Sequence, residues 1–265
     1  MGAQFYTRSA VYFAMFASFG VSSPFVPLLY STLVPPAQVG MLVAVGPIIS
    51  IGAGPASAAI ADLYDCHRAV MVGSLALGAC LWLVLLIPDL VFPELLALAV
   101  LQAVLGGKSG SILDASTVEA VGARYGRIRL WGAVGFGICS LVGGALIEAA
   151  GDAAPFRWML LAAVALGLLA AVMISFLSVE GLRQQKHDDG QGEKPATRGL
   201  RGLRDTLLSA RVAVFLLIVF LSGIASGLID TYLYIHLDAL GAGGTLMGLA
   251  RFITCAAEVP FFRSE

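Results

Sequence analysis

Charged residues are scarce in this sequence of 265 residues: Asp, Glu, Lys and Arg make up 12% of it, whereas 58% is hydrophobic. An ordinary soluble domain is about 25% charged, so this composition cannot cover a water-exposed surface. The mean hydropathy of +0.89 indicates instead that lipid surrounds most side chains. A net charge of −1 also excludes the basic surface that nucleic acid requires, so no nucleic-acid partner is expected.

Cysteine and histidine are rare as well. The four cysteines (Cys66, Cys80, Cys139 and Cys255) have no CxxC spacing, and three of them fall in apolar runs, where Cys behaves as a small hydrophobe. We therefore expect no catalytic cysteine, disulfide, metal or cofactor. His236 and Asp238 point apart at a spacing of two residues in a helix. No catalytic constellation emerges, so we do not expect an enzyme.

Long apolar runs are what the sequence has instead. A helix needs about 20 apolar residues to cross the hydrocarbon core of a bilayer. Seven segments reach this length: Ala10–Leu33, Gln38–Ala61, Ala69–Ile87, Leu95–Thr117, Leu130–Ala150, Phe156–Leu177 and Val212–His236. An eighth opens near Thr245, so the predicted fold class is an all-α integral membrane protein.

Basic residues alternate between the two sides of the predicted spans. Arg8, Arg68 and the cluster Arg124, Arg127 and Arg129 fall on one side, together with a long polar segment rich in Lys and Arg. The loops of the other side carry Arg157 as their only basic residue. Because Lys and Arg accumulate in cytoplasmic loops, we expect the N-terminus and the long segment to be cytoplasmic in a multi-pass membrane protein.

The long polar segment also divides the chain. We predict a six-helix bundle over residues 1–179, a cytoplasmic linker over 180–210 and the start of a second bundle over 211–265. Within the linker, Leu200, Leu203 and Leu207 share one helical face beside Arg201 and Arg204. This pattern fits either a short helix on the anionic inner leaflet or a plain solvated linker.

Charges inside a membrane are costly and commonly functional. Asp230 lies about six residues before the outer end of the seventh span and Arg251 about six after it, so both sit roughly 9 Å deep and an ion pair is expected. Glu258, two turns beyond Arg251, either carries a proton or serves as a structural partner. Lys108 either faces the central cavity or extends toward the cytoplasm beside flexible glycines.

Several prolines fall within the predicted spans. Pro24 and Pro27 in the first span, and Pro47 and Pro55 in the second, free backbone carbonyls. They fit either broken helices near a transport site or the ordinary abundance of proline in membrane helices. Pro260 follows Glu258 closely and is expected to kink or end its helix.

The run Tyr125-Gly-Arg-Ile-Arg-Leu-Trp-Gly-Ala-Val-Gly-Phe-Gly137 resembles a signature of the major facilitator superfamily. It is most similar to the branch with lactose permease, nucleoside–proton symporters and phenylpropionate permease. Three further stretches support the resemblance: Gln38-Val-Gly40, Ala61–Arg68 and Leu240–Pro260. The resemblance implies twelve helices in two halves, of which this chain has the first half and about two helices more. It also implies a gating loop with Asp62 and Arg68 between the second and third helices.

The resemblance further implies a substrate site. By position relative to the signature, Asp114 and Arg129 are expected to hold the solute and Phe136 to stack on it, with Lys108 nearby. The implied function is proton-coupled symport of a small polar organic solute (a sugar, nucleoside or organic acid) by alternating access. A non-transporting, receptor-like or decayed membrane protein is the alternative. We expect no transport from the chain of 265 residues alone, which uptake in proteoliposomes tests.

Overall fold

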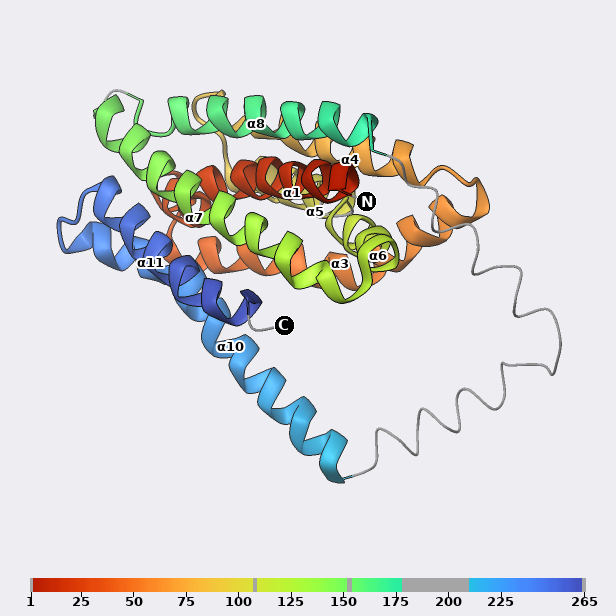
Figure 1. Ribbon diagram of the computed structural model, residues 1–265. Coiled ribbons are helices and arrows are strands. Elements are labelled where there is room, and N and C mark those ends of the chain that lie inside the picture. The colour runs from red at the N-terminus through yellow and green to blue at the C-terminus, as the bar shows by residue number, and fades with distance from the viewer. Residues whose placement is uncertain (1, 107–108, 152–153, 178–209, 264–265) are drawn as a thin grey trace, which may run out of the picture.

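A computed structural model describes residues 2–106, 109–151, 154–177 and 210–263, and their regular structure is entirely helical (Figure 1). The α-helices are α1 (Gly2–Ser22), α2 (Val26–Leu33), α3 (Pro36–Leu63), α4 (His67–Leu81), α5 (Phe92–Leu105), α6 (Ser109–Val121), α7 (Tyr125–Ala150), α8 (Arg157–Ser175), α10 (Ala210–Ala239) and α11 (Gly244–Arg263). Short 3₁₀ helices occupy Ser23–Phe25, Trp82–Leu86 and Gly122–Arg124. Lys108 and the predicted linker, apart from Ala210, lie outside the described residues.

Seven stretches of the described chain are long and apolar enough to cross a membrane, which confirms the seven predicted spans. They are Gln4–Leu33, Pro36–Tyr64, His67–Leu86, Phe92–Val121, Tyr125–Ala150, Arg157–Ser175 and Arg211–Ala239. The chain is therefore a multi-pass, all-α membrane protein, in which α11 follows the seventh span.

The first span is the centre of the bundle. In its most apolar stretch 78% of residues are buried, against 0% for the span of α10. Figure 1 shows α1 between α8 and α7. Small side chains let neighbours approach α1 closely: Ser18 Oγ donates to the carbonyl oxygen of Ala163 on α8 at 3.2 Å. The span of α10 diverges from the others and turns most of its apolar side chains outward, as lipid permits.

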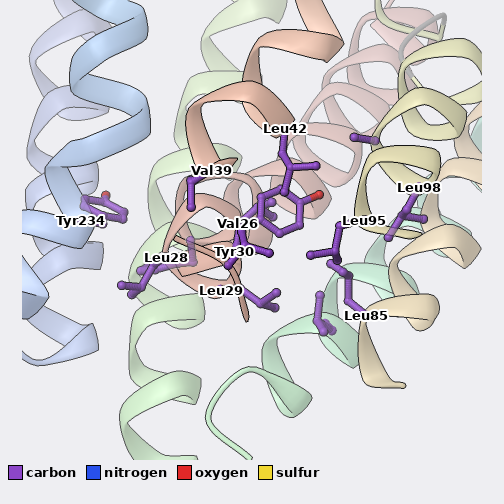
Figure 2. Packing of buried hydrophobic residues seen from close by; sticks show 14 of the residues in the cluster. Val26, Leu28, Leu29, Tyr30, Val39, Leu42, Leu85, Leu95, Leu98 and Tyr234 are labelled. Atoms are coloured by element: carbon purple, nitrogen blue, oxygen red, sulfur yellow. The ribbon is translucent and has the colours of Figure 1, made fainter. Parts of the chain in front are cut away.

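Two apolar clusters close the two ends of the bundle. At the end where α2 turns into α3, here called the Val34 end, Tyr30, Leu95 and Leu98 belong to a cluster that also includes Tyr234 of α10 (Figure 2). At the opposite end, here called the Arg124 end, Tyr12, Leu113 and other buried side chains form the second cluster. The site described below lies along α7, between these ends.

Several helix boundaries differ from those predicted. The first helix begins at Gly2 and not near Ala10, and α7 begins at Tyr125 and not at Leu130, so that Arg127 and Arg129 are helical. Hydropathy misplaced these ends because a helix continues into the polar interface, where long basic side chains reach water. The fourth predicted span is formed by α5 and α6, on either side of residues 107–108.

Prolines break the first span but not the second. The α-helix stops at Ser22 and resumes at Val26 around Pro24. By contrast, α3 runs unbroken through Pro47 and Pro55, so these two prolines are of the kind common in membrane helices and do not mark a break. α11 likewise continues past Pro260 to Arg263, so the helix does not end there. Each proline removes one amide donor, and a long helix keeps enough of its other hydrogen bonds to continue.

Candidate functional site

A cavity of about 760 Å³ lies between the first six spans and the helices α10 and α11. Its walls come from α1 to α3 and α7 on one side and from α10 and α11 on the other. The charged and aromatic side chains that line it are Phe16, Arg129, Phe136, Asp230, Tyr234, Arg251 and Glu258. Its volume falls within the roughly 300–1,000 Å³ of small-molecule sites.

Five of the residues singled out from the sequence line this one cavity: Arg129, Phe136, Asp230, Arg251 and Glu258. Asp114 stands next to the cavity wall as a partner of Arg129. The gating-loop residues Asp62 and Arg68 lie elsewhere, in the last turn of α3 and the first turn of α4 at the Arg124 end. The structure thus brings together residues more than 120 positions apart in the sequence.

Arg251 and Asp230 join α11 to α10 on one side of the cavity. Arg251 Nη1 lies 3.0 Å from Asp230 Oδ1, with 29% and 51% of the two side chains exposed. The antiparallel turn between the helices brings the two residues to the same depth, which is the juxtaposition that their sequence positions predict. Both side chains line the cavity, so the pair is accessible from it.

On the other side, Arg129 of α7 meets Asp114 of α6. Arg129 Nη1 lies 3.4 Å from Asp114 Oδ1, and about a third of each side chain is exposed. Tyr12 of α1 donates its hydroxyl proton to the same carboxylate oxygen at 2.5 Å. The carboxylate therefore ties together three helices at the Arg124 end of the cavity.

Each cavity arginine also lies over an aromatic ring. The guanidinium carbon of Arg129 is 4.4 Å from the ring centroid of Phe16, and that of Arg251 is 5.5 Å from the centroid of Phe136. Both distances are within the roughly 6 Å of cation–π contacts. Such contacts hold a guanidinium flat while leaving its N–H edges free to donate hydrogen bonds.

The glycines of α7 explain how these helices come so close. A Cβ at Gly132 would stand 2.9 Å from the ring of Phe16, and one at Gly135 would stand 2.5 Å from the carbonyl oxygen of Phe13. On another face of α7, a Cβ at Gly137 would meet Cys255 of α11 at 2.9 Å. The glycine-rich run after Arg129 thus allows α7 to pack between α1 and α11, which sets the positions of Arg129 and Phe136.

Sequence reasoning missed Tyr12 and Phe16. They are one helical turn apart on α1 and their rings stack, with centroids 6.1 Å apart and planes at 10°. Their spacing is that of any buried apolar face, so nothing local distinguished them from core residues. Only the packing of α1 against α6 and α7 reveals their polar and cationic partners.

The predicted gating residues lie on either side of the turn between α3 and α4. Asp62 Oδ1 lies 2.8 Å from Nε2 of His67. Asp65 has a positive φ of 50°, a conformation that Asp tolerates better than most residues and that lets the chain reverse direction. Arg68 is exposed in the first turn of α4. A gating role for Asp62 and Arg68 stays a prediction.

Among the described residues, no group of three or more His, Cys, Asp or Glu side chains is placed to hold a metal ion. The chemistry of the site, in the part of the chain that the structure describes, is therefore that of arginines, carboxylates and aromatic rings.

Comparison with known proteins gives a family model and one curated relative. The model described as "MFS_1 like family" matches residues 6–265. The relative is "Uncharacterized transporter YwbF" of Bacillus subtilis (strain 168), which is 25% identical over 260 residues. The alignment covers 95% of this chain and 61% of the relative, so the chain spans about three fifths of that protein's length. No solved structure matches.

Proposed function

The chain belongs to the MFS_1 like family, and from this we propose that it forms the solute-binding part of a proton-coupled secondary transporter. The observation that carries the proposal is the cavity, on which Arg129, Phe136, Asp230, Arg251 and Glu258 converge. In such transporters the solute binds between two halves that rock about it. Here the cavity likewise lies between the first six spans and the two helices that follow.

The chemistry of the cavity favours a small polar organic solute, such as a sugar, a nucleoside or an organic acid. Arg129 offers a planar set of donors to hydroxyl or carboxylate oxygens, and Asp114 accepts from hydroxyls. Phe136 presents a ring to an apolar face of the solute. A volume of about 760 Å³ accommodates a solute of this size with some water. Lys108, outside the described residues, remains a proposed member of this group.

Proton coupling is assigned to the opposite wall. Glu258 is exposed on the cavity, and Asp230 is half exposed beside Arg251. When a proton neutralises one of these carboxylates, Arg251 loses an electrostatic partner and becomes available to the other carboxylate or to the solute. Such a change of partner links protonation to the packing of α10 against α11, and hence to alternating access.

The membrane orientation and the domain division belong to the same proposal. Residues 1–179 form the first bundle, 180–210 a cytoplasmic linker and 211–265 the start of the second bundle. The N-terminus is then cytoplasmic, and Asp62 and Arg68 act as a gating loop on the cytoplasmic side. The excess of Arg in the connections at the Arg124 end supports this orientation.

Ligand binding by the chain itself tests the proposal, because the chain supplies the described walls of the cavity. The purified protein in lipid nanodiscs is heated with lactose, uridine or phenylpropionate, and its unfolding temperature is followed against concentration. One of these solutes should raise the unfolding temperature in a saturable manner. Arg129→Lys should weaken that stabilisation at least about tenfold, because lysine cannot replace the planar fork of donors.

Uptake separates transport from binding alone. The stabilising solute is added in radiolabelled form outside proteoliposomes that carry an inward proton gradient, and its uptake is measured with and without a protonophore. The protein reconstituted is this chain or a longer one that includes it. Uptake that the protonophore abolishes supports proton symport by that protein. Saturable binding without uptake by any of them favours the receptor-like alternative, and a flat response to all three solutes contradicts the proposed solute class.

A further inference from the structure

Tyr12 holds the Asp114 carboxylate more closely than Arg129 does. Tyr12 is completely buried (0% exposed), and a buried phenol needs an acceptor for its hydroxyl. Its bond to Asp114 Oδ1, at 2.5 Å, is at the short end for a hydroxyl donating to a carboxylate. Arg129 reaches the same oxygen only at 3.4 Å, whereas charged N–H to carboxylate bonds usually span about 2.7–2.9 Å.

The position of the Tyr12 hydroxyl is fixed by its neighbours. The Tyr12 ring stacks on Phe16 and meets Tyr125 edge-on, with centroids 6.1 Å and 6.5 Å away. Phe16 in turn carries the guanidinium of Arg129. Tyr12, Asp114, Arg129 and Phe16 therefore form a closed ring of contacts across α1, α6 and α7, in which the tyrosine cannot move without disturbing the others.

In this arrangement Asp114 Oδ1 accepts hydrogen bonds from both Tyr12 and Arg129. The guanidinium of Arg129 has five N–H groups, of which one makes the long contact with Asp114. The side chain is 31% exposed and lines the cavity. Most of the donors of Arg129 thus remain uncommitted to Asp114, although a carboxylate lies near enough to form a tighter, two-bond pair.

We propose that Tyr12 is a positioning residue that draws Asp114 toward α1 and so keeps Arg129 available to solute oxygen atoms, such as those of a carboxylate or of hydroxyls. The inference rests on the proposed function, since it takes Arg129 to be the group that meets the solute. Tyr12 itself does not touch the solute and acts only through Asp114.

The test measures how available Arg129 is without any solute, so its outcome is independent of the binding and uptake assays. The purified protein of 265 residues is treated with phenylglyoxal, which modifies accessible guanidinium groups. Modification of Arg129 is quantified by peptide mass spectrometry relative to Arg157, an exposed arginine at the Val34 end. Tyr12→Phe keeps the ring but removes the hydroxyl, so Asp114 can close on Arg129. Labelling of Arg129 should become roughly fivefold slower, which corresponds to about 1 kcal/mol of additional interaction between Arg129 and Asp114.

If Tyr12 had a purely structural role, Tyr12→Phe would only loosen the packing, and Arg129 would be labelled at the same rate or faster. Either result in a folded Tyr12→Phe protein would overturn the proposal. In an Asp114→Asn background there is no carboxylate to close, so adding Tyr12→Phe should cause no slowing; slowing there would also count against it. Tyr30→Phe removes another buried tyrosine hydroxyl, away from the cavity, and should leave the labelling ratio unchanged.

If Tyr12→Phe does not fold, Asp114→Asn still decides the point. Because Tyr12 already leaves most donors of Arg129 uncommitted to Asp114, removal of the charge should leave the labelling rate of Arg129 nearly unchanged. Clearly faster labelling would show that Asp114 restrains Arg129 despite Tyr12 and would refute the proposed role of Tyr12.

Discussion

Arg251 and Asp230 lie on successive antiparallel helices, with Nη1 of the arginine 3.0 Å from Oδ1 of the aspartate. The turn between α10 and α11, centred near Gly241, brings them to equal depth in the bundle. Both side chains are partly exposed and line the cavity. The ion pair therefore connects α10 to α11 and is accessible from the cavity.

Neutralising either member of this pair should destabilise the protein, and neutralising both should cost less than the sum. We expect Asp230→Asn and Arg251→Gln to lower the unfolding temperature, with a coupling of about 1 kcal/mol in the double-mutant cycle. Thermal unfolding followed by fluorescence-detected size exclusion provides the measurement. Asp238→Asn, the same change in an exposed position on the last turn of α10, is the matched control and should be near neutral. Strict additivity of the two single changes would show that the pair is not energetically coupled.

The depth of this pair was predictable because helix geometry converts residue counts into distance. The seven spans were predictable for a similar reason, since about 20 apolar residues are needed to cross the hydrocarbon core. Helix ends were harder, because α7 begins with polar residues: Arg127 is exposed, and Arg129 pairs with Asp114 inside the bundle. Hydropathy alone therefore placed the start of α7 too late.

The partners of Arg129 show what the sequence cannot provide. Asp114 was assigned through a family resemblance, whereas Tyr12 and Phe16 were not singled out at all. Their contacts with Asp114 and Arg129 depend on which faces of α1, α6 and α7 meet. The periodicity of a single sequence shows that a helix face is apolar, but it does not show which other helix that face contacts. Because α1 and α7 are far apart in the sequence, no local spacing of residues could predict the contact between them.

Close packing of α7 against α11 should depend on glycine at defined positions. A Cβ at Gly248 would stand 2.6 Å from the carbonyl oxygen of Ser140, and Gly144 and Gly244 approach each other through their backbones. Gly248→Val should therefore separate the helices and cost about 1–3 kcal/mol of stability, as overpacking commonly does. The unfolding temperature, measured in nanodiscs, should fall clearly.

Gly223 is the matched control for this prediction, because the space around it is open in the described structure. Gly223→Val should leave stability unchanged or raise it by a few tenths of a kcal/mol, since the space is open and valine is a better helix former than glycine. Equal effects of the two substitutions would mean that the close approach of α7 and α11 is not what Gly248 provides.

Glu148, near the end of α7, should protect the first turn of α11. Its Oε2 accepts a hydrogen bond from the backbone amide of Thr245 at 2.9 Å, and a carboxylate at a helix N-terminus is favourable. Glu148→Gln should accelerate hydrogen–deuterium exchange of the peptide that contains Thr245, and high salt should reduce the difference. Glu94→Gln, which removes the charge from the corresponding contact with the amide of Val91, just before α5, should accelerate exchange only in its own turn. Equal protection of Thr245 with and without the Glu148 charge would contradict this assignment.

Cysteine labelling tests the proposed orientation directly. Cys66 lies in the turn between α3 and α4 at the Arg124 end, which the distribution of Arg assigns to the cytoplasm. In a variant whose other three cysteines are replaced by alanine, a membrane-impermeant maleimide should label Cys66 only after the cells are permeabilised. Ala37→Cys, introduced into the same variant after Cys66 is also removed, places an exposed thiol at the Val34 end and should be labelled in intact cells. The reverse pattern would invert the topology, and it would place the Arg-rich connections on the outer side, where their attraction to the anionic inner leaflet is lost.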